Sequence, residues 1–326
     1  MQTNPSQNDL KKKKQIPFIE ILKEAARIVW RNKFLLWFGV LMALGSPGSF
    51  NIGNNENWGE KGDAAKNFLE THWQIVLTVA LFLLAIGIIL FLISLVGKAG
   101  LVRSVNFIVQ NKKTTFRAGW QEGKKYLWRL FRLFLLFFFA TMIIVLVLAL
   151  PVVYLAVTGS WVSAVLVGLL AVAIFIPLIF ILALTNIFAE FYIILSNLKV
   201  WSAVETGYNL LLKNILNSLV FGLLLLVVNI IAGIVLLPAA GLALLILIPT
   251  GILFYYLNKI IFGIFLAFAI LLFLLIILFV SSIFLTYKTT AWILFFREIA
   301  KVENEEAEKV AEKETEKQIA ATPEKA

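Results

Sequence analysis

Long uncharged stretches alternate with short charged ones along this chain of 326 residues. Trp73 to Gly97, Asn214 to Asn258 and Ile260 to Tyr287 carry no charged residue, and Leu133 to Leu198 carries only Glu190. A helix needs about 20 apolar residues to cross a bilayer core about 30 Å thick, and each stretch reaches that length. Because backbone groups in hydrocarbon must be hydrogen-bonded within their segment, and strand-like alternation is absent, we expect helices.

Two of these stretches are too long for a single crossing, and turn-forming residues divide them. Thr158-Gly159-Ser160 predicts a turn in the first stretch. In the second, Pro238 with Gly241 and Pro249 with Gly251 predict breaks. The piece between the prolines is short enough for a re-entrant segment over 239–257, and a seventh full span there is the alternative. The chain is thus expected to be an all-α, polytopic membrane protein of about six spans, near 34–46, 73–97, 133–157, 161–187, 214–237 and 260–287.

The first of these segments is unusually short. Phe34 to Leu44 has the length of the apolar part of a signal peptide, with lysines before it and Gly45 and Ser46 after it. The region before it is longer than a usual signal-peptide start and has the pattern of an ordered helix. We therefore expect the segment to be retained, with cleavage as the alternative.

The distribution of lysine and arginine predicts the orientation in the membrane. Residues 1–33 carry eight of them and residues 98–132 carry nine, whereas the loop 46–72 carries two, against four acids. Basic residues in short loops favour the cytoplasmic side, so both basic segments are expected there. An even number of spans then keeps both termini of a multi-pass cell-membrane protein in the cytoplasm. The expected divisions are a basic N-terminal tail, a helical membrane domain and a charged cytoplasmic tail, over 1–15, 16–298 and 299–326.

Composition supports a membrane protein and limits the chemistry. Hydrophobic residues make up 61% of the chain and charged residues 15%, whereas a soluble domain has about 25% charged residues. Cysteine is absent, which excludes disulfides and thiolate metal ligands. The net charge of +10 is placed beside apolar runs, so it indicates anionic lipid headgroups rather than nucleic acid.

A basic, tryptophan-containing segment recurs before the spans. When Phe18 is placed over Phe116, Trp30 falls on Trp128 and Arg31 on Arg129, and a fainter third copy begins at Trp201. Such segments favour amphipathic helices at the cytoplasmic membrane surface, where the rings lie at headgroup level and the cations reach phosphates. Ordinary anchoring gives the same pattern and is the commoner cause. The candidate headgroup contacts are Arg27, Trp30, Arg31, Lys124, Lys125, Trp128 and Arg129.

Two parts of the chain carry a family resemblance. Leu101-Val102-Arg103-Ser104 through Trp128-Arg129, and Phe188-Ala189-Glu190 followed by Ala203-Val204-Glu205-Thr206-Gly207-Tyr208, resemble the membrane domain of some bacterial glycerophosphoryl diester phosphodiesterases and of their stand-alone relatives. The resemblance covers most of residues 18–296. It implies a six-helix module of unassigned role at the bacterial envelope. Because no soluble phosphodiesterase domain is present, it implies no catalytic residues.

The residues needed for catalysis are scarce. His72 is the only histidine, so neither a histidine–carboxylate metal cluster nor a serine–histidine–aspartate triad is expected, and we predict no cofactor, no metal and no enzymatic activity. Polar groups inside spans are the remaining functional candidates: Glu190, Asn186 and Asn229. Glu190 could bind a cation, relay a proton or hold a substrate amine, but we expect it to reach headgroup water at the cytoplasmic end of its helix.

These observations favour a non-enzymatic membrane module that contacts anionic lipids or envelope partners. The alternative is a transporter or lipid translocator that uses a polar path near Glu190, because the chain combines repeats, proline-broken spans and an intramembrane acid. The sequence identifies no substrate, protein partner or oligomeric state.

Overall fold

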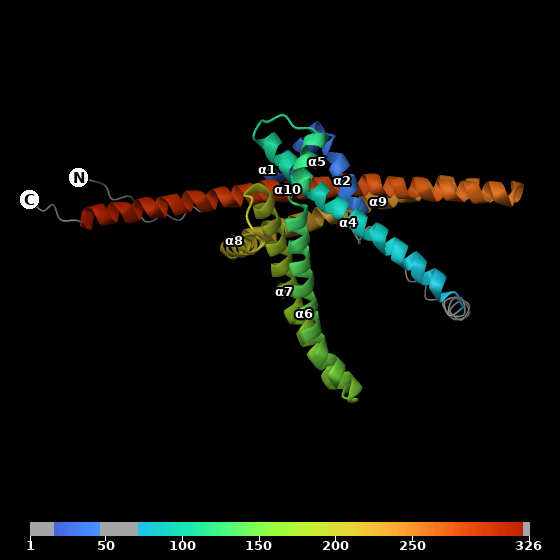
Figure 1. Ribbon diagram of the computed structural model, residues 1–326, viewed down its shortest axis with the longest axis horizontal. Helices are drawn as coiled ribbons and strands as arrows, with labels where there is room; N and C mark the ends of the chain where they lie inside the picture. The colour runs from blue at the N-terminus through green and yellow to red at the C-terminus, as the bar shows by residue number, and fades with distance from the viewer. Residues whose placement is uncertain (1–15, 46–70, 322–326) are drawn as a thin grey trace, which may run out of the picture. The chain divides into compact units, whose positions relative to one another are not determined.

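The computed structural model describes residues 16–45 and 71–321, and this part of the chain contains helices and no strand (Figure 1). The all-α class expected from the sequence is therefore confirmed. The helices, in chain order, are α1 (Phe18–Arg31), α2 (Leu35–Leu44), α4 (Trp73–Val109), α5 (Phe116–Lys124), α6 (Leu127–Val157), α7 (Trp161–Leu195), α8 (Val200–Lys213), α9 (Ile215–Leu257) and α10 (Lys259–Ala321).

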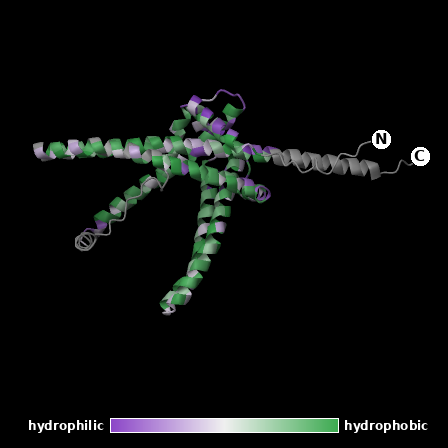
Figure 2. Cartoon of the chain, turned by 180° about the vertical axis from the view of Figure 1, so that it is seen from behind, coloured by the Kyte–Doolittle hydropathy of each residue, from purple (hydrophilic) through white to green (hydrophobic). Residues whose placement is uncertain are grey.

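Long apolar helices make the chain a multi-pass helical membrane protein. Within the described residues, 5 helices are long and apolar enough to cross a bilayer. Figure 2 shows these helices as hydrophobic over most of their length, with hydrophilic residues gathered around the loop from α4 to α5. Their large side chains are mostly exposed, which is stable only where lipid replaces water as the solvent. The candidate spans lie in Trp73–Val109, Leu127–Val157, Trp161–Leu195, Ile215–Ile234 and Ile260–Lys301.

The chain forms two compact units, and several long helices pass from one to the other. Of the described residues, the first unit contains 16–30, 133–225 and 289–321. The second contains Arg31–Arg132 and Leu226–Lys288. Each unit has its own core, so each is described separately.

Aromatic side chains fill the core of the first unit. Phe221 is fully buried and stacks on Phe295, with ring centroids 4.3 Å apart and planes 9° apart. Trp292 meets the ring of Phe221 edge-on at 5.1 Å, and Phe188 lies 6.1 Å from Phe296. Rings packed at these separations add attraction to the hydrophobic gain of burial. The core therefore joins α7, α9 and the part of α10 after Thr289.

The core of the second unit is built around the short helix α2. Phe38 is fully buried, and its ring lies 4.7 Å from that of Phe116 on α5. At Gly97 of α4, an added Cβ would lie 2.9 Å from Cβ of Leu41, so α2 and α4 pack closely. Helix α2 has 10 residues and is about 15 Å long, half of what a crossing needs. The expected first span, 34–46, is thus a short packed helix within the described residues.

The hairpin of α6 and α7 turns at Gly159, the residue that the sequence places at a turn. Helix α6 ends at Val157, α7 begins at Trp161, and Gly159 has φ 79°, a conformation that favours glycine. Ala164 and Gly168, four residues apart on α7, share one face of the helix; Ala164 is buried, and an added Cβ at Gly168 would lie 3.8 Å from Val152. The corresponding pair on α10, Gly263 and Ala267, is exposed.

The expected breaks at Pro238 and Pro249 are wrong, because α9 continues through both prolines as one helix of 43 residues. A separate segment over 239–257 is therefore not present; the chain turns back only at Asn258. A proline kinks a membrane helix without ending it when neighbouring groups satisfy the freed carbonyl. Helix α9 pairs antiparallel with α10, through Phe254 and Phe265 at 5.0 Å near the turn. The number of membrane crossings stays a prediction.

Candidate functional site

Helix α1 buries one face and exposes another, which bears the first set of predicted headgroup contacts. Ile21 and Ala25 are buried, whereas Trp30 is 79% exposed and Arg31 is exposed. The side chain of Arg27 is 58% exposed and forms an ion pair with Glu24 one turn away. An exposed surface ion pair contributes little to stability, so Arg27 stays available to an anion in solution or in a membrane.

The second set lies where α5 leads into α6. Trp128 is 67% exposed, and Lys124 and Lys125 are exposed. Arg129 is half-buried, so it is the least accessible of the predicted contacts. The ammonium of Lys124 lies 5.6 Å from the ring of Trp120, in cation–π geometry. Contact of these side chains with lipid stays a prediction.

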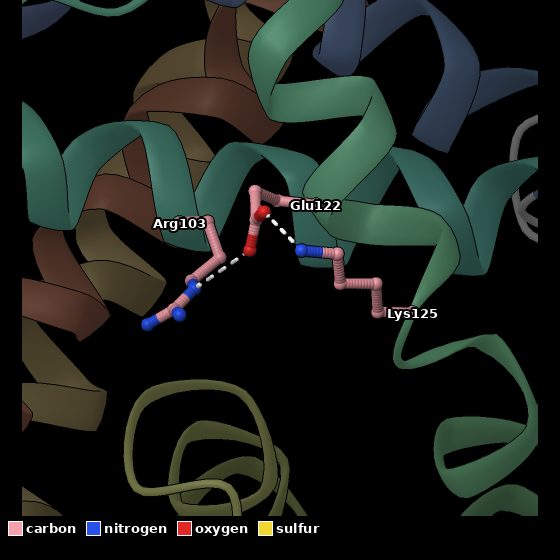
Figure 3. A network of polar contacts seen from close by, with 3 residues as sticks. All are labelled: Arg103, Glu122 and Lys125. Carbon is pink, nitrogen blue, oxygen red and sulfur yellow. Dashed lines mark hydrogen bonds and ion pairs between the residues drawn. The ribbon is translucent and has the colours of Figure 1, made fainter.

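A three-residue ionic network fixes α5 against the end of α4. Figure 3 shows the Glu122 carboxylate between Arg103 and Lys125, with one oxygen toward each. Arg103 Nε lies 3.8 Å from Glu122 Oε2, and Lys125 Nζ lies 2.5 Å from Oε1. The Arg103 guanidinium also lies 5.5 Å from the ring of Phe107 and 5.7 Å from that of Tyr126. Arg103 and Glu122 are far apart in the sequence and nothing in the pattern relates them, so this ionic network was not predicted.

Close backbone approaches position the short helices α5 and α8. At Gly123 of α5, an added Cβ would lie 2.5 Å from the Val96 carbonyl oxygen and 2.8 Å from the Gly100 nitrogen on α4. At Gly207 of α8, an added Cβ would lie 2.9 Å from the Ala189 nitrogen on α7. Each unit thus contains a long helix and a short helix in backbone contact. Gly123, Gly207 and Ala189 lie in the segments that carry the family resemblance.

Asparagine ends the long helix in both pairs. Asn111 follows α4 with φ 57°, and Asn197 follows α7 with φ 56°. Asparagine tolerates this left-handed conformation better than most residues, and it commonly ends helices. Thr115 then caps α5, its Oγ1 accepting a hydrogen bond from the Ala118 nitrogen at 3.4 Å. The sequence therefore determines locally where the chain turns from α4 toward α5.

Glu190 lies in the protein interior, and this corrects the expectation that it reaches headgroup water. It is 8% exposed, and Asn186 Nδ2 donates a hydrogen bond to its Oε1 at 3.2 Å. Asn186 and Glu190 are four residues apart, so both lie on the same face of α7. The oxygen of Asn186 is buried without a hydrogen-bond partner in the described structure. Asn229, the third predicted polar residue, is exposed on the part of α9 in the second unit.

Two basic residues of the second unit were not selected from the sequence. Lys98 on α4 and Lys288 on α10 are both half-buried, and the charge of Lys98 acts on Lys288. The sequence shows that each lysine follows an uncharged stretch, but it does not show that the charge of one acts on the other. Among the described residues, His72 is exposed and no group of three or more histidine, cysteine or acidic side chains could hold a metal ion.

A family model matches residues 30–301, and its description is "Family of unknown function (DUF7544)". The match runs from the end of α1 to residue 301 of α10, so it includes the helices that form the cores of both units. No curated protein and no solved structure matches the chain.

Proposed function

The chain belongs to the DUF7544 family of unknown function, and from this premise we propose that it is a non-enzymatic membrane module that contacts anionic lipids. The observation that carries the proposal is the exposure of the repeated tryptophans beside exposed cations. Trp30 and Trp128 are 79% and 67% exposed, although tryptophan is a large and usually buried residue. At a membrane surface these rings lie among headgroups, and the adjacent cations attract phosphate.

The proposal includes the cytoplasmic orientation of both termini, in a bacterial cell membrane. The inner leaflet carries anionic lipid, and each basic residue close to it contributes about 1 kcal/mol of attraction. The resemblance to the membrane domain of bacterial glycerophosphoryl diester phosphodiesterases belongs to the proposal too. It falls on the helix pairs α4–α5 and α7–α8, where glycines allow close backbone approaches.

The test measures lipid selectivity with the full chain reconstituted in phosphatidylcholine bilayers. Spin-labelled phosphatidylglycerol and phosphatidylcholine are compared by the fraction that the protein immobilises. We expect several-fold selectivity for phosphatidylglycerol that weakens at high salt, because salt screens exposed charges. Replacing Arg27, Arg31 and Lys124 by glutamine should reduce the selectivity.

The matched control replaces three lysines of the charged tail, Lys309, Lys313 and Lys317, by glutamine. This control removes the same charge without changing α1 or α5, so the selectivity should stay. Equal immobilisation of the two labelled lipids by the unaltered protein would contradict the proposed function.

Burial of Glu190 favours a second candidate function, that of a transporter or lipid translocator. A buried carboxylate with an amide neighbour is costly in a membrane protein, and such groups are commonly functional. In vesicles containing the protein, Glu190→Gln should abolish lipid scrambling or solute flux, whereas Glu205→Gln on α8 should not. A flux that is unchanged by Glu190→Gln would remove Glu190 from the mechanism.

A further inference from the structure

Lys98 and Lys288 occupy equivalent places in the sequence. Lys98 follows the uncharged stretch Trp73 to Gly97, and Lys288 follows the uncharged stretch Ile260 to Tyr287. On a membrane helix the first charge after an apolar run lies close to the headgroups, with the alkyl stem along apolar surface. Each ammonium is therefore placed at the level of lipid phosphates.

The tertiary structure brings these two positions together through helix α2. Gly97, next to Lys98, lies against Leu41, as described above. On the other side of α2, an added Cβ at Gly39 would meet Thr286 Oγ1 and the Ser282 carbonyl oxygen of α10. Both lysines thus lie within one turn of a close contact with the same ten-residue helix.

Lys98 and Lys288 are both half-buried, and the charge of Lys98 acts on Lys288. Like charges repel, and burial removes part of the water that would screen them. Arg103, in the same unit, has the carboxylate of Glu122 as a counter-charge. No ion pair joins Lys288 to a carboxylate in the part of the chain that the structure describes. A phosphate group has several acceptor oxygens and can receive hydrogen bonds from two ammonium groups at once.

We propose that Lys98 and Lys288 together bind one phosphate group, that of an anionic lipid headgroup. The inference rests on the proposed contact with anionic lipid and makes it more specific, since it predicts a single site with a defined stoichiometry. It differs from the exposed cations of α1 and α5, which attract an anionic surface without fixing one lipid. The half-buried site favours a lipid that stays bound when detergent removes the others.

The experiment uses the full chain in detergent, stripped of lipid and then titrated with phosphatidylglycerol, phosphatidylcholine or inorganic phosphate. Native mass spectrometry counts the bound lipid, and a thermal shift reports protection. The unaltered protein should retain one phosphatidylglycerol and be protected by it more than by phosphatidylcholine. Lys98→Gln and Lys288→Gln should each weaken this binding about fivefold, the effect of one charge near a membrane surface.

The control variant is Lys113→Gln, in the exposed loop between α4 and α5. It removes one charge from the same unit and should bind phosphatidylglycerol as the unaltered protein does. The double variant Lys98→Gln with Lys288→Gln should lose less than the product of the two single losses, because both residues hold one group. Protection by millimolar inorganic phosphate that depends on both lysines would identify the site as one for free phosphate as well.

Stability without anionic lipid separates a binding defect from misfolding. Removing one of two like charges should leave Lys288→Gln at least as heat-stable as the unaltered protein in phosphatidylcholine. If the unaltered protein prefers phosphatidylglycerol but Lys113→Gln weakens binding as much as Lys98→Gln does, the site is wrong and the general function stands. If the unaltered protein shows no preference, the proposed function itself fails.

Discussion

Replacing Gly123 by alanine should destabilise the second unit, because the new methyl group meets backbone atoms. Its Cβ would lie 2.5 Å from the Val96 carbonyl oxygen and 2.8 Å from the Gly100 nitrogen. Ordinary contact between such atoms needs about 3.5 Å, so α5 would have to move away from α4 by about 1 Å. Overpacking of this kind costs about 1–3 kcal/mol, and backbone atoms cannot rotate out of the way as a side chain can.

Gly87 supplies the matched control for this substitution. It lies inside α4, and an added Cβ there would have no neighbour within 4 Å. Gly87→Ala should therefore leave the contact between α4 and α5 intact. Because alanine favours a helix more than glycine does, the substitution should raise the free energy of unfolding by about 1 kcal/mol at most. The two substitutions add the same methyl group, so they should change stability in opposite directions.

The assay is reversible unfolding of the purified protein in mixed micelles with increasing dodecyl sulfate, followed by tryptophan fluorescence. The free energy of unfolding of Gly123→Ala should be about 1–3 kcal/mol below that of the unaltered protein. If Gly123→Ala were as stable as Gly87→Ala, the close approach of α4 and α5 at this residue would be wrong.

Two further substitutions test the first unit by the same unfolding assay. Gly207→Ala should lower the free energy of unfolding by about 1–2 kcal/mol, because the added Cβ would lie 2.9 Å from the Ala189 nitrogen. Gly222 has open space around it, so Gly222→Ala should not lower it. Equal stabilities of the two variants would count against the α7–α8 contact. Phe221→Ala should lower the free energy of unfolding by about 3–5 kcal/mol, since it removes a fully buried ring from the stack with Phe295. The side chain of Phe268 is 61% exposed, so Phe268→Ala should lower it far less.

The sequence predicted the local features of this protein because these depend on short-range chemistry. Uncharged stretches of 25 or more residues form helices in lipid, since no other single segment satisfies its own backbone there. Gly159 ends one helix because glycine tolerates its left-handed conformation, and this turn was expected. The exposed tryptophans Trp30 and Trp128 also follow from a pattern that repeats at a fixed offset.

Errors occurred where neighbours that are distant in sequence decide the outcome. Pro238 and Pro249 signal breaks locally, but α9 continues through both prolines as one helix, and near its end Phe254 packs against Phe265 of α10. Glu190 was expected at headgroup water, but it is buried in the first unit, whose core α7 shares with α9 and α10. Neither partner is visible in the sequence around these residues.

By itself, then, the sequence determined the helical class, the membrane environment and the turn between α6 and α7. Only the tertiary structure decided that the charge of Lys98 acts on Lys288, that Arg103 has Glu122 as its counter-ion, and that Gly123 fits against α4. The physical reason is that helix formation in lipid is set by the composition of one segment. Contacts between helices depend instead on the shapes and charges of side chains from several segments at once.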